Sequence, residues 1–482
     1  MNIYLTRCSP VYPIKGYVFM KTPQLIKNVK NMIADKQFIG ALLSIGIPVV
    51  IQNAISSSLN LVDVVMIGKL GESSISGVGL ANQYFFIYVL LLFGTNSGAG
   101  VYIAQYWGKG DKKSVMKTAG VALTISFFAS LAFAAVAGFA PTLCIKLFTT
   151  DIETVRIGAS YLSIISLTFP LTAISFALAQ ASRSVRNTKL PMMASAISLI
   201  VNTMLNYLLI FGKFGFPELG VEGAAWATVI ARLVEVSFMI FATRKKENPL
   251  SEPLNTYFSY DFAFVKTIMR TSFPVILNEF LWAIGVTLYV LAYARSGTDA
   301  YAAVQISQTV DKLFFVFAFG IGSAGGVMIG NALGEGQMEK AFKYAWYLNY
   351  LSIFTGIFLG LLLMLLSPLV VKLFNVSDAI RFDAVRVMFF VGLFMALKMC
   401  NALQIIGTLR GGGDTKYALY MEIGSVYLVG VPLAFIGTAV LDLPIYWVVF
   451  LVSTEEIVKA YFGFKRLHSR RWANNLVSTK AT

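Results

Sequence analysis

Apolar stretches long enough to cross a lipid bilayer recur along the whole 482-residue chain, and they constrain its fold more than any other feature. A membrane-spanning helix needs about 20 predominantly apolar residues. Only 13% of the residues are charged, whereas a soluble domain carries about 25%. Because a bilayer offers no water to the backbone, continuous apolar stretches form helices there. We therefore expect an all-α integral membrane protein with twelve transmembrane helices, at roughly 38–66, 74–106, 118–140, 156–181, 190–212, 220–242, 267–294, 300–330, 342–366, 383–409, 418–438 and 445–463.

The net charge of +15 is distributed unevenly over the expected loops. The loops and adjoining helix ends on the side that holds both termini carry 28 of the 39 Lys and Arg residues, and the loops and helix ends on the opposite side carry 8. Cytoplasmic loops of membrane proteins are enriched in these residues. We therefore expect a multi-pass protein of the cell (inner) membrane with both termini in the cytoplasm, and no nucleic-acid partner.

The two halves of the chain resemble each other at an offset of 226 residues. Pro48 to Lys113 aligns without a gap on Pro274 to Glu339, and the glycine-rich stretch "GTNSGAGVYIAQYWGKG" meets "GIGSAGGVMIGNALGEG". After a one-residue slip, Arg183 matches Arg410. Because six is an even number, both halves enter the membrane in the same direction. Parallel repeats of this kind are typical of secondary transporters.

This repeat predicts two six-helix lobes. The expected parts are a cytoplasmic N-terminal tail (1–36), an N-lobe of helices 1–6 (37–243), a cytoplasmic linker (244–265), a C-lobe of helices 7–12 (266–464) and a basic cytoplasmic C-terminal tail (465–482). The glycine clusters recur at the same place in both halves. Small residues let membrane helices approach closely, so helix packing is the simplest interpretation, and a sliding contact is the alternative.

The sequence indicates neither an enzyme nor a cofactor. The three cysteines are scattered, the single histidine, His468, lies in the basic tail, and no metal-ligand spacing is present. "LRGGGDTK" at 409–416 lacks the GxxxxGK[ST] spacing of a phosphate-binding loop. We expect no structural metal, no cofactor and no ATP-driven step within this chain.

Several stretches resemble the multidrug and toxic compound extrusion (MATE) family over nearly the full length of the chain. They are "LVDVVMIGKLG" at 61–71, "YLLIFGKFGFPELGVEGAAWATVI" at 207–230, "PVILNEFLWAIG" at 274–285, "TLRGGGDTK" at 408–416 and "STEEIVKAYFGFKRLHSRRW" at the end. The resemblance implies a cation-coupled efflux transporter with an aspartate on helix 1, which Asp63 matches. Helix 4 of this chain lacks the carboxylate that family members often carry there.

Polar residues within the first lobe define a candidate coupling site. Gln52, Ser56, Asn60 and Asp63 fall within one arc of helix 1. Helix 5 carries a similar stripe that includes Asn202 and Asn206. A charge inside a membrane is by default a functional hypothesis. We expect ion or proton coupling at Asp63 with Asn60 and Asn202, and Na⁺ binding near Asp63; a satisfied polar core is the alternative.

The second lobe carries its own polar residues. Glu279 lies in an apolar stretch of helix 7 and is expected to take part in coupling, unless it forms a structural ion pair with Lys398. The repeat aligns Glu279 with Asn53 and Asp63 with Tyr289, which predicts an asymmetric ion site. The residues expected to line the substrate cavity are Gln52, Asn206, Asn278, Trp282, Gln305, Gln308, Lys398 and Asn401.

These features favour a secondary transporter over other classes. We expect an exporter of organic, often cationic or amphiphilic, compounds in exchange for Na⁺ or H⁺ by alternating access, which works as a monomer. A lipid-linked oligosaccharide flippase of related architecture is the alternative, and several Arg and Lys residues in the central cavity would favour it. A membrane enzyme or receptor is disfavoured because the chain has no cluster of catalytic residue types.

Overall fold

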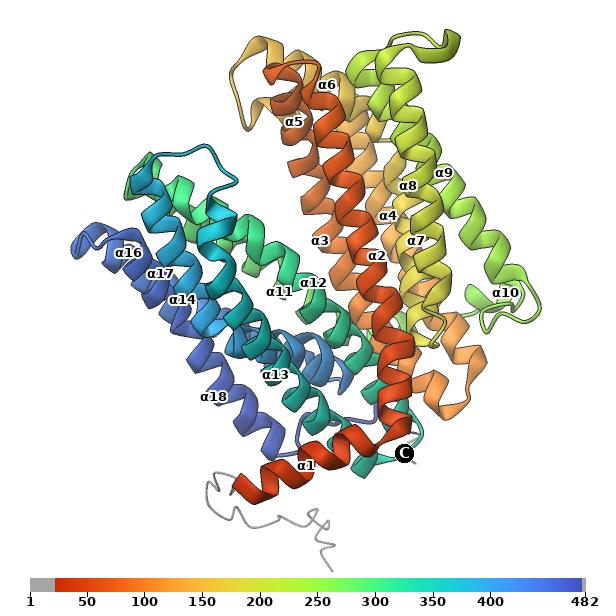
Figure 1. Cartoon of the computed structure of the whole chain (residues 1–482). Coiled ribbons are helices and arrows are strands. Elements are labelled where there is room, and N and C mark those ends of the chain that lie inside the picture. The colour runs from red at the N-terminus through yellow and green to blue at the C-terminus, as the bar shows by residue number, and fades with distance from the viewer. Residues whose placement is uncertain (1–21, 479–482) are drawn as a thin grey trace, which may run out of the picture.

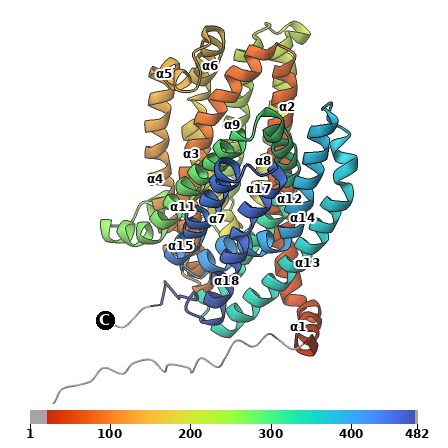
Figure 2. The ribbon, with the colours of Figure 1, turned by 90° about the vertical axis from the view of Figure 1, so that its left-hand side faces the viewer.

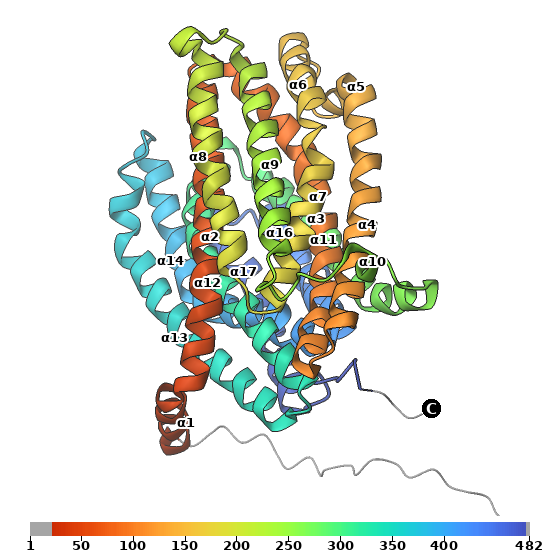
Figure 3. The ribbon, with the colours of Figure 1, turned by 90° about the vertical axis from the view of Figure 1, so that its right-hand side faces the viewer.

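A computed structural model describes residues 22–478, and within them all regular secondary structure is helical. The helices form two lobes that diverge like the arms of a V (Figure 1). The lobes meet at the end of the molecule where α1 (Thr22–Ala34) and the C-terminus lie. Figures 2 and 3 show the same arrangement from the C-lobe side and the N-lobe side.

The N-lobe contains six membrane-spanning segments. Five are single helices: α2 (Lys36–Gly68), α3 (Glu72–Lys109), α4 (Lys112–Phe139), α8 (Lys189–Phe211) and α9 (Gly220–Arg244). The sequence predicted one helix at 156–181, but this segment is a pair, α6 (Ile152–Ile165) and α7 (Thr168–Ser184), bent by 52°. The short helix α5 (Pro141–Lys146) precedes the pair, and α10 (Leu254–Tyr257) lies in the connection to the second lobe.

The C-lobe repeats this plan. Its segments are α11 (Phe262–Arg295), α12 (Thr298–Gly334), α13 (Met338–Val371), α14 with the π-helical turn η2 (Asp378–Leu403 and Gln404–Leu409), α15 to η4 (415–440), and α17 with α18 (Ile445–Ser453 and Glu455–His468). Ten helices of the described chain are individually long and apolar enough to span a membrane. The bent pair α6–α7 raises the number of candidate spans in the described chain to eleven, and the pair α17–α18 lies at the place of the predicted twelfth helix.

The internal repeat is visible in the packing of the two lobes. Helix α3 of the N-lobe packs against α11 and α12, and α12 packs against α2. The turns before α3 and α12 both use a glycine with positive φ, 115° at Gly71 and 104° at Gly297, a conformation that other residues rarely adopt. The glycines form an inter-lobe seam in which each contact recurs with the lobes exchanged: Gly94 on Ile276 and Gly320 on Val50, Gly108 on Asn331 and Gly334 on Gln105.

Helix α1, which the sequence analysis placed within a tail, lies across the closed end of the V (Figure 1). Asp35 at its end caps α2 by accepting a hydrogen bond from the Phe38 amide at 2.9 Å, and it pairs with Lys343 of α13 at 2.6 Å. Burial raises the pKa of Asp35, but the hydrogen bonds from Lys343 and Phe38 outweigh it and leave the pKa below its ordinary value. The junction of α1 and α2 is thereby attached to the C-lobe.

Candidate functional site

A cavity of about 330 Å³ lies between the two lobes. Its lining comes from α2, α3, α7, α8 and α9 of the N-lobe and from α12, η2 and Arg410 of the C-lobe. The walls combine aromatic side chains with small polar ones. The aromatic residues are Phe85, Phe93, Phe176 and Phe319; the polar ones include Gln52, Asn53, Ser56, Ser97, Thr172, Ser175, Gln180 and Ser323.

The charged residues of the cavity are three arginines and one glutamate. Arg232 pairs with Glu235, three residues further along α9, through a 2.7 Å contact, and Ser175 also donates to Glu235 at 2.7 Å. Arg410 forms an ion pair outside the lining set, with Glu279. Within the described chain, Arg183 donates to two neutral oxygens, those of Gln52 and Gln180, at 3.2 and 2.8 Å, and to no carboxylate.

A second polar cluster lies inside the N-lobe, separate from the residues that line the cavity. Asn206 donates a hydrogen bond to Asp63 and another to Asn202, the latter at 3.0 Å. Asn202 in turn donates to Thr228 at 3.2 Å. Asn202 and Asn206 are fully buried, and the Asn206 side-chain oxygen has no hydrogen-bond partner within the described chain. Carboxylate and amide oxygens suit Na⁺ or a proton, so the donor set fits the expected ion.

The polar stripe on α2 divides between these two places. Gln52 and Ser56 line the cavity, and Asp63 joins the cluster with Asn206. Asn60 is exposed, and no hydrogen bond to its side chain is found within residues 22–478. Asn206, expected in the cavity, is a member of the Asp63 cluster instead.

Glu279 is paired, but not with the residue that the sequence suggested. Its carboxylate accepts from Arg410 at 2.6 Å, and the two side chains are 13% and 4% exposed. Lys398 pairs with Asp311 of α12. The alternative that the sequence left open, a Glu279–Lys398 ion pair, is therefore wrong. Contacts between distant helices depend on how the helices cross, which residue spacing within a single helix does not reveal.

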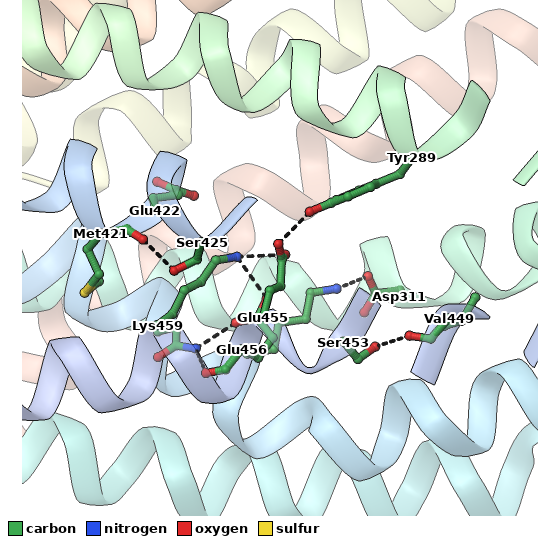
Figure 4. A network of polar contacts seen from close by, with 12 residues as sticks. Tyr289, Asp311, Met421, Glu422, Ser425, Val449, Ser453, Glu455, Glu456 and Lys459 are labelled. Carbon is green, nitrogen blue, oxygen red and sulfur yellow. Dashed lines mark hydrogen bonds and ion pairs between the residues drawn. The ribbon is translucent and has the colours of Figure 1, made fainter. Parts of the chain in front are cut away.

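The C-lobe holds an extensive charged network (Figure 4). Lys459 of α18 lies between Glu455 and Glu456, at 2.9 and 3.2 Å, and Tyr289 donates to Glu455 at 2.5 Å. These three α18 residues lie deep in the lobe, since Glu455 and Lys459 are only 6% and 5% exposed. Their position indicates a polar interior in the C-lobe.

The remaining predicted cavity residues lie outside the lining set, and two of them contact carboxylates of the C-lobe. Asn401 donates to Glu456 at 2.7 Å, and Asn278 donates to Glu422 at 2.7 Å. Gln305 donates to Tyr301 on its own helix, while Trp282 and Gln308 are partly buried. Of the eight residues expected to line the cavity, Gln52 alone belongs to the lining of the cavity described here.

Sequence reasoning did not assign a site role to the residues that give the cavity its charge. Arg183 and Arg410 were visible as a matched pair in the repeat, which was the available signal. Asp311 and Glu422 carried none, because they lie in otherwise ordinary helical stretches. Among the described residues there is no cluster of His, Cys, Asp or Glu that could hold a metal ion.

Known proteins resemble this chain along most of its length. The sequence model of the MatE family matches residues 48–208 and 274–436. A probable multidrug resistance protein NorM of Thermotoga maritima is 26% identical over 446 residues, which cover 91% of this chain and 94% of that protein. The multidrug resistance protein MdtK of Photorhabdus laumondii is 24% identical, with coverage of 82% and 87%.

A solved structure gives the same fold. It is described as the outward-facing conformation of a multidrug resistance MATE family transporter, and it superposes with a TM-score of 0.82 at 21% identity. The match covers 89% of this chain and 96% of that one. The two-lobe, twelve-helix architecture expected from the sequence is confirmed.

Proposed function

Because the chain belongs to the MatE family of multidrug efflux transporters, we propose that it exports organic, amphiphilic compounds across the inner membrane in exchange for Na⁺ or H⁺. It works by alternating access, as a monomer with both termini in the cytoplasm. Parallel-repeat transporters bind substrate between their halves and move one half against the other. The central cavity and the V-shaped arrangement of the lobes support this proposal.

One observation carries the coupling part of the proposal: the Asp63 cluster lies inside one lobe, apart from the cavity. An ion bound there changes the charge and hydrogen bonding of α2, and α2 also contributes Gln52 and Ser56 to the cavity wall. Occupation of the cluster can therefore alter the substrate site through a shared helix without direct competition. Glu279 is a second candidate for coupling, since it touches a cavity residue, Arg410.

A lipid-linked oligosaccharide flippase is the second candidate. The three cavity arginines favour it, whereas the lining predicted from the sequence contained no arginine. Two of these arginines are neutralised by Glu235 and Glu279, however, which leaves one uncompensated positive charge. The family match and the names of the relatives, which refer to multidrug resistance, favour multidrug efflux.

Transport by reconstituted vesicles tests the proposal. Efflux of fluorescent organic dyes is followed under an imposed Na⁺ gradient or an imposed pH gradient. We expect one of the gradients to drive transport by the wild-type protein. Asp63→Asn should lower this transport to near the level of protein-free vesicles, because it removes the charge but keeps the shape and the oxygen that accepts from Asn206.

A matched variant controls for loss of an aspartate. Asp378→Asn changes a side chain that is 97% exposed and should transport like the wild-type protein. If Asp63→Asn retains wild-type gradient-driven efflux, Asp63 belongs to a satisfied polar core and the coupling proposal fails.

A further inference from the structure

The two lobes place equivalent arginines in the cavity but give them different partners. Arg183 and Arg410 occupy matching positions of the repeat, and both line the cavity. Arg410 meets the carboxylate of Glu279, whereas Arg183 meets only amide oxygens. Within residues 22–478, no carboxylate lies within ion-pair distance of Arg183.

The repeat shows where a carboxylate that pairs with Arg183 would stand. Asn53 stands in the N-lobe where Glu279 stands in the C-lobe, and Asn53 also lines the cavity. The neighbouring contact confirms that the two lobes pack alike. Gln52 donates to Ser195 at 3.2 Å, and the repeat-equivalent Asn278 donates to Glu422 at 2.7 Å.

Hydrogen-bond donors are left over at this position. The buried amide nitrogen of Asn53 has no partner within the described chain. A guanidinium presents several donors in a planar fork, which matches the two oxygens of a carboxylate and also fits phosphate. A charge removed from water and left unpaired is costly, so an arriving anion would be stabilised by both groups.

We propose that Arg183 and Asn53 bind the oxyanion of an amphiphilic organic substrate, which takes the place that Glu279 fills beside Arg410. The aromatic walls at Phe85, Phe93 and Phe176 hold its apolar body, and 330 Å³ lies within the usual range for small-molecule sites. This substrate class differs from the cationic compounds that the family resemblance implies. The inference rests on the proposed function for its biological use, but binding can be tested without transport.

The probe is a pair of dyes that share one chromophore. Rhodamine 110 carries a free carboxylate at neutral pH, and rhodamine 123 is its methyl ester. Binding to the purified full-length protein is followed by fluorescence polarisation in detergent without an ion gradient. We expect rhodamine 110 to bind about tenfold more tightly, since a hydrogen bond to a charged group is worth at least that factor.

Substitutions at Asn53 test the proposed site while Arg183 stays in place. Asn53→Glu should supply the missing carboxylate, pair with Arg183 and abolish the preference for rhodamine 110. Asn53→Gln introduces a side chain of the same size as Asn53→Glu but without its charge. This variant should still bind rhodamine 110 more tightly than rhodamine 123. Arg183→Gln should lose the preference, whereas Arg156→Gln, at a side chain that is 72% exposed, should keep it.

Competition separates the sources of the oxyanion. Displacement of rhodamine 110 by salicylate supports a small organic anion, and displacement by a short-chain phosphatidic acid alone would overturn that assignment. Equal binding of the two dyes, or an unchanged preference in Asn53→Glu, would overturn the anion site itself. Because no gradient is present, a failure of ion coupling would leave these results unaffected.

Discussion

At the residue scale, the two lobes differ most in where they keep their carboxylates. The N-lobe has Asp63 on its first helix among neutral amides, while the C-lobe has Glu279 beside an arginine and Glu455 and Glu456 around Lys459. A carboxylate among amides can change its charge or bind a cation at little cost to its neighbours. A carboxylate that neutralises a buried guanidinium cannot be removed so freely, because the arginine is then left unpaired.

Glu279→Gln therefore has two separable effects. Arg410 is only 4% exposed on its side chain, so loss of its partner should lower the free energy of unfolding by about 3–5 kcal/mol. The double variant Glu279→Gln/Arg410→Gln removes both charges and should recover most of that stability. Thermal unfolding of the purified variants measures the first effect, and transport per folded molecule measures the second.

The double variant also decides the role of Glu279. If Glu279 takes part in coupling, the recovered protein should still transport poorly when an ion gradient is imposed. Normal specific transport in the stabilised double variant would mean that Glu279 serves the structure alone.

At the element scale, the sequence predicted the helices better than their partners. The apolar stretches and the repeat sufficed for twelve spans in two lobes, because both signals lie along the chain. The bend between α6 and α7 lies at residues 166–167, just before Pro170. Pro170 has no backbone N–H to donate to the Ser166 carbonyl, which explains the break, but the length of the apolar stretch favoured one continuous helix. The ion-pair partners of Glu279 and Lys398 could not be predicted, because they depend on how the helices cross. The identity of the cavity-lining residues depends on the same geometry.

The C-terminal segment is an element that the sequence described only as a basic tail. Asn474 donates its backbone amide to Gly412 of the C-lobe at 2.9 Å, and its carbonyl accepts from Gln105 of the N-lobe at 3.0 Å. Val477 accepts from Lys109 at 2.8 Å. These contacts join both lobes at the closed end of the V, so the segment should stabilise that closed state.

Truncation after Ala473 tests this role while keeping Trp472, which is fully buried. The truncation removes both partners of the buried Gln105 amide and should cost about 1–3 kcal/mol. A cysteine introduced at Ser184, in the cavity wall, should then react faster with a thiol reagent added from the cytoplasmic side. An unchanged labelling rate would show that the segment does not control opening of this end.

At the scale of the whole molecule, the seam between the lobes fits a surface that must open and close. Gly108 and Gly334 bring backbone against backbone across it, where any Cβ would clash, and Arg186 of the N-lobe lies 3.7 Å from Glu335 of the C-lobe. At these two glycines backbone meets backbone and little side-chain area is buried, so separating these contacts costs less than separating a packed core of the same extent.

Cross-linking across this seam tests alternating access directly. Arg186→Cys/Glu335→Cys, in a chain whose three native cysteines are replaced, can be joined by a short reducible bifunctional thiol reagent. Because the proposed alternating access requires the closed end of the V to open, the cross-link should reduce transport to near background, and reduction of the reagent should restore it. Either single cysteine variant treated in the same way should transport normally, since no link forms. A fully cross-linked protein that still transports at the wild-type rate would mean that the lobes need not separate here, and substrate would then have to pass by another route.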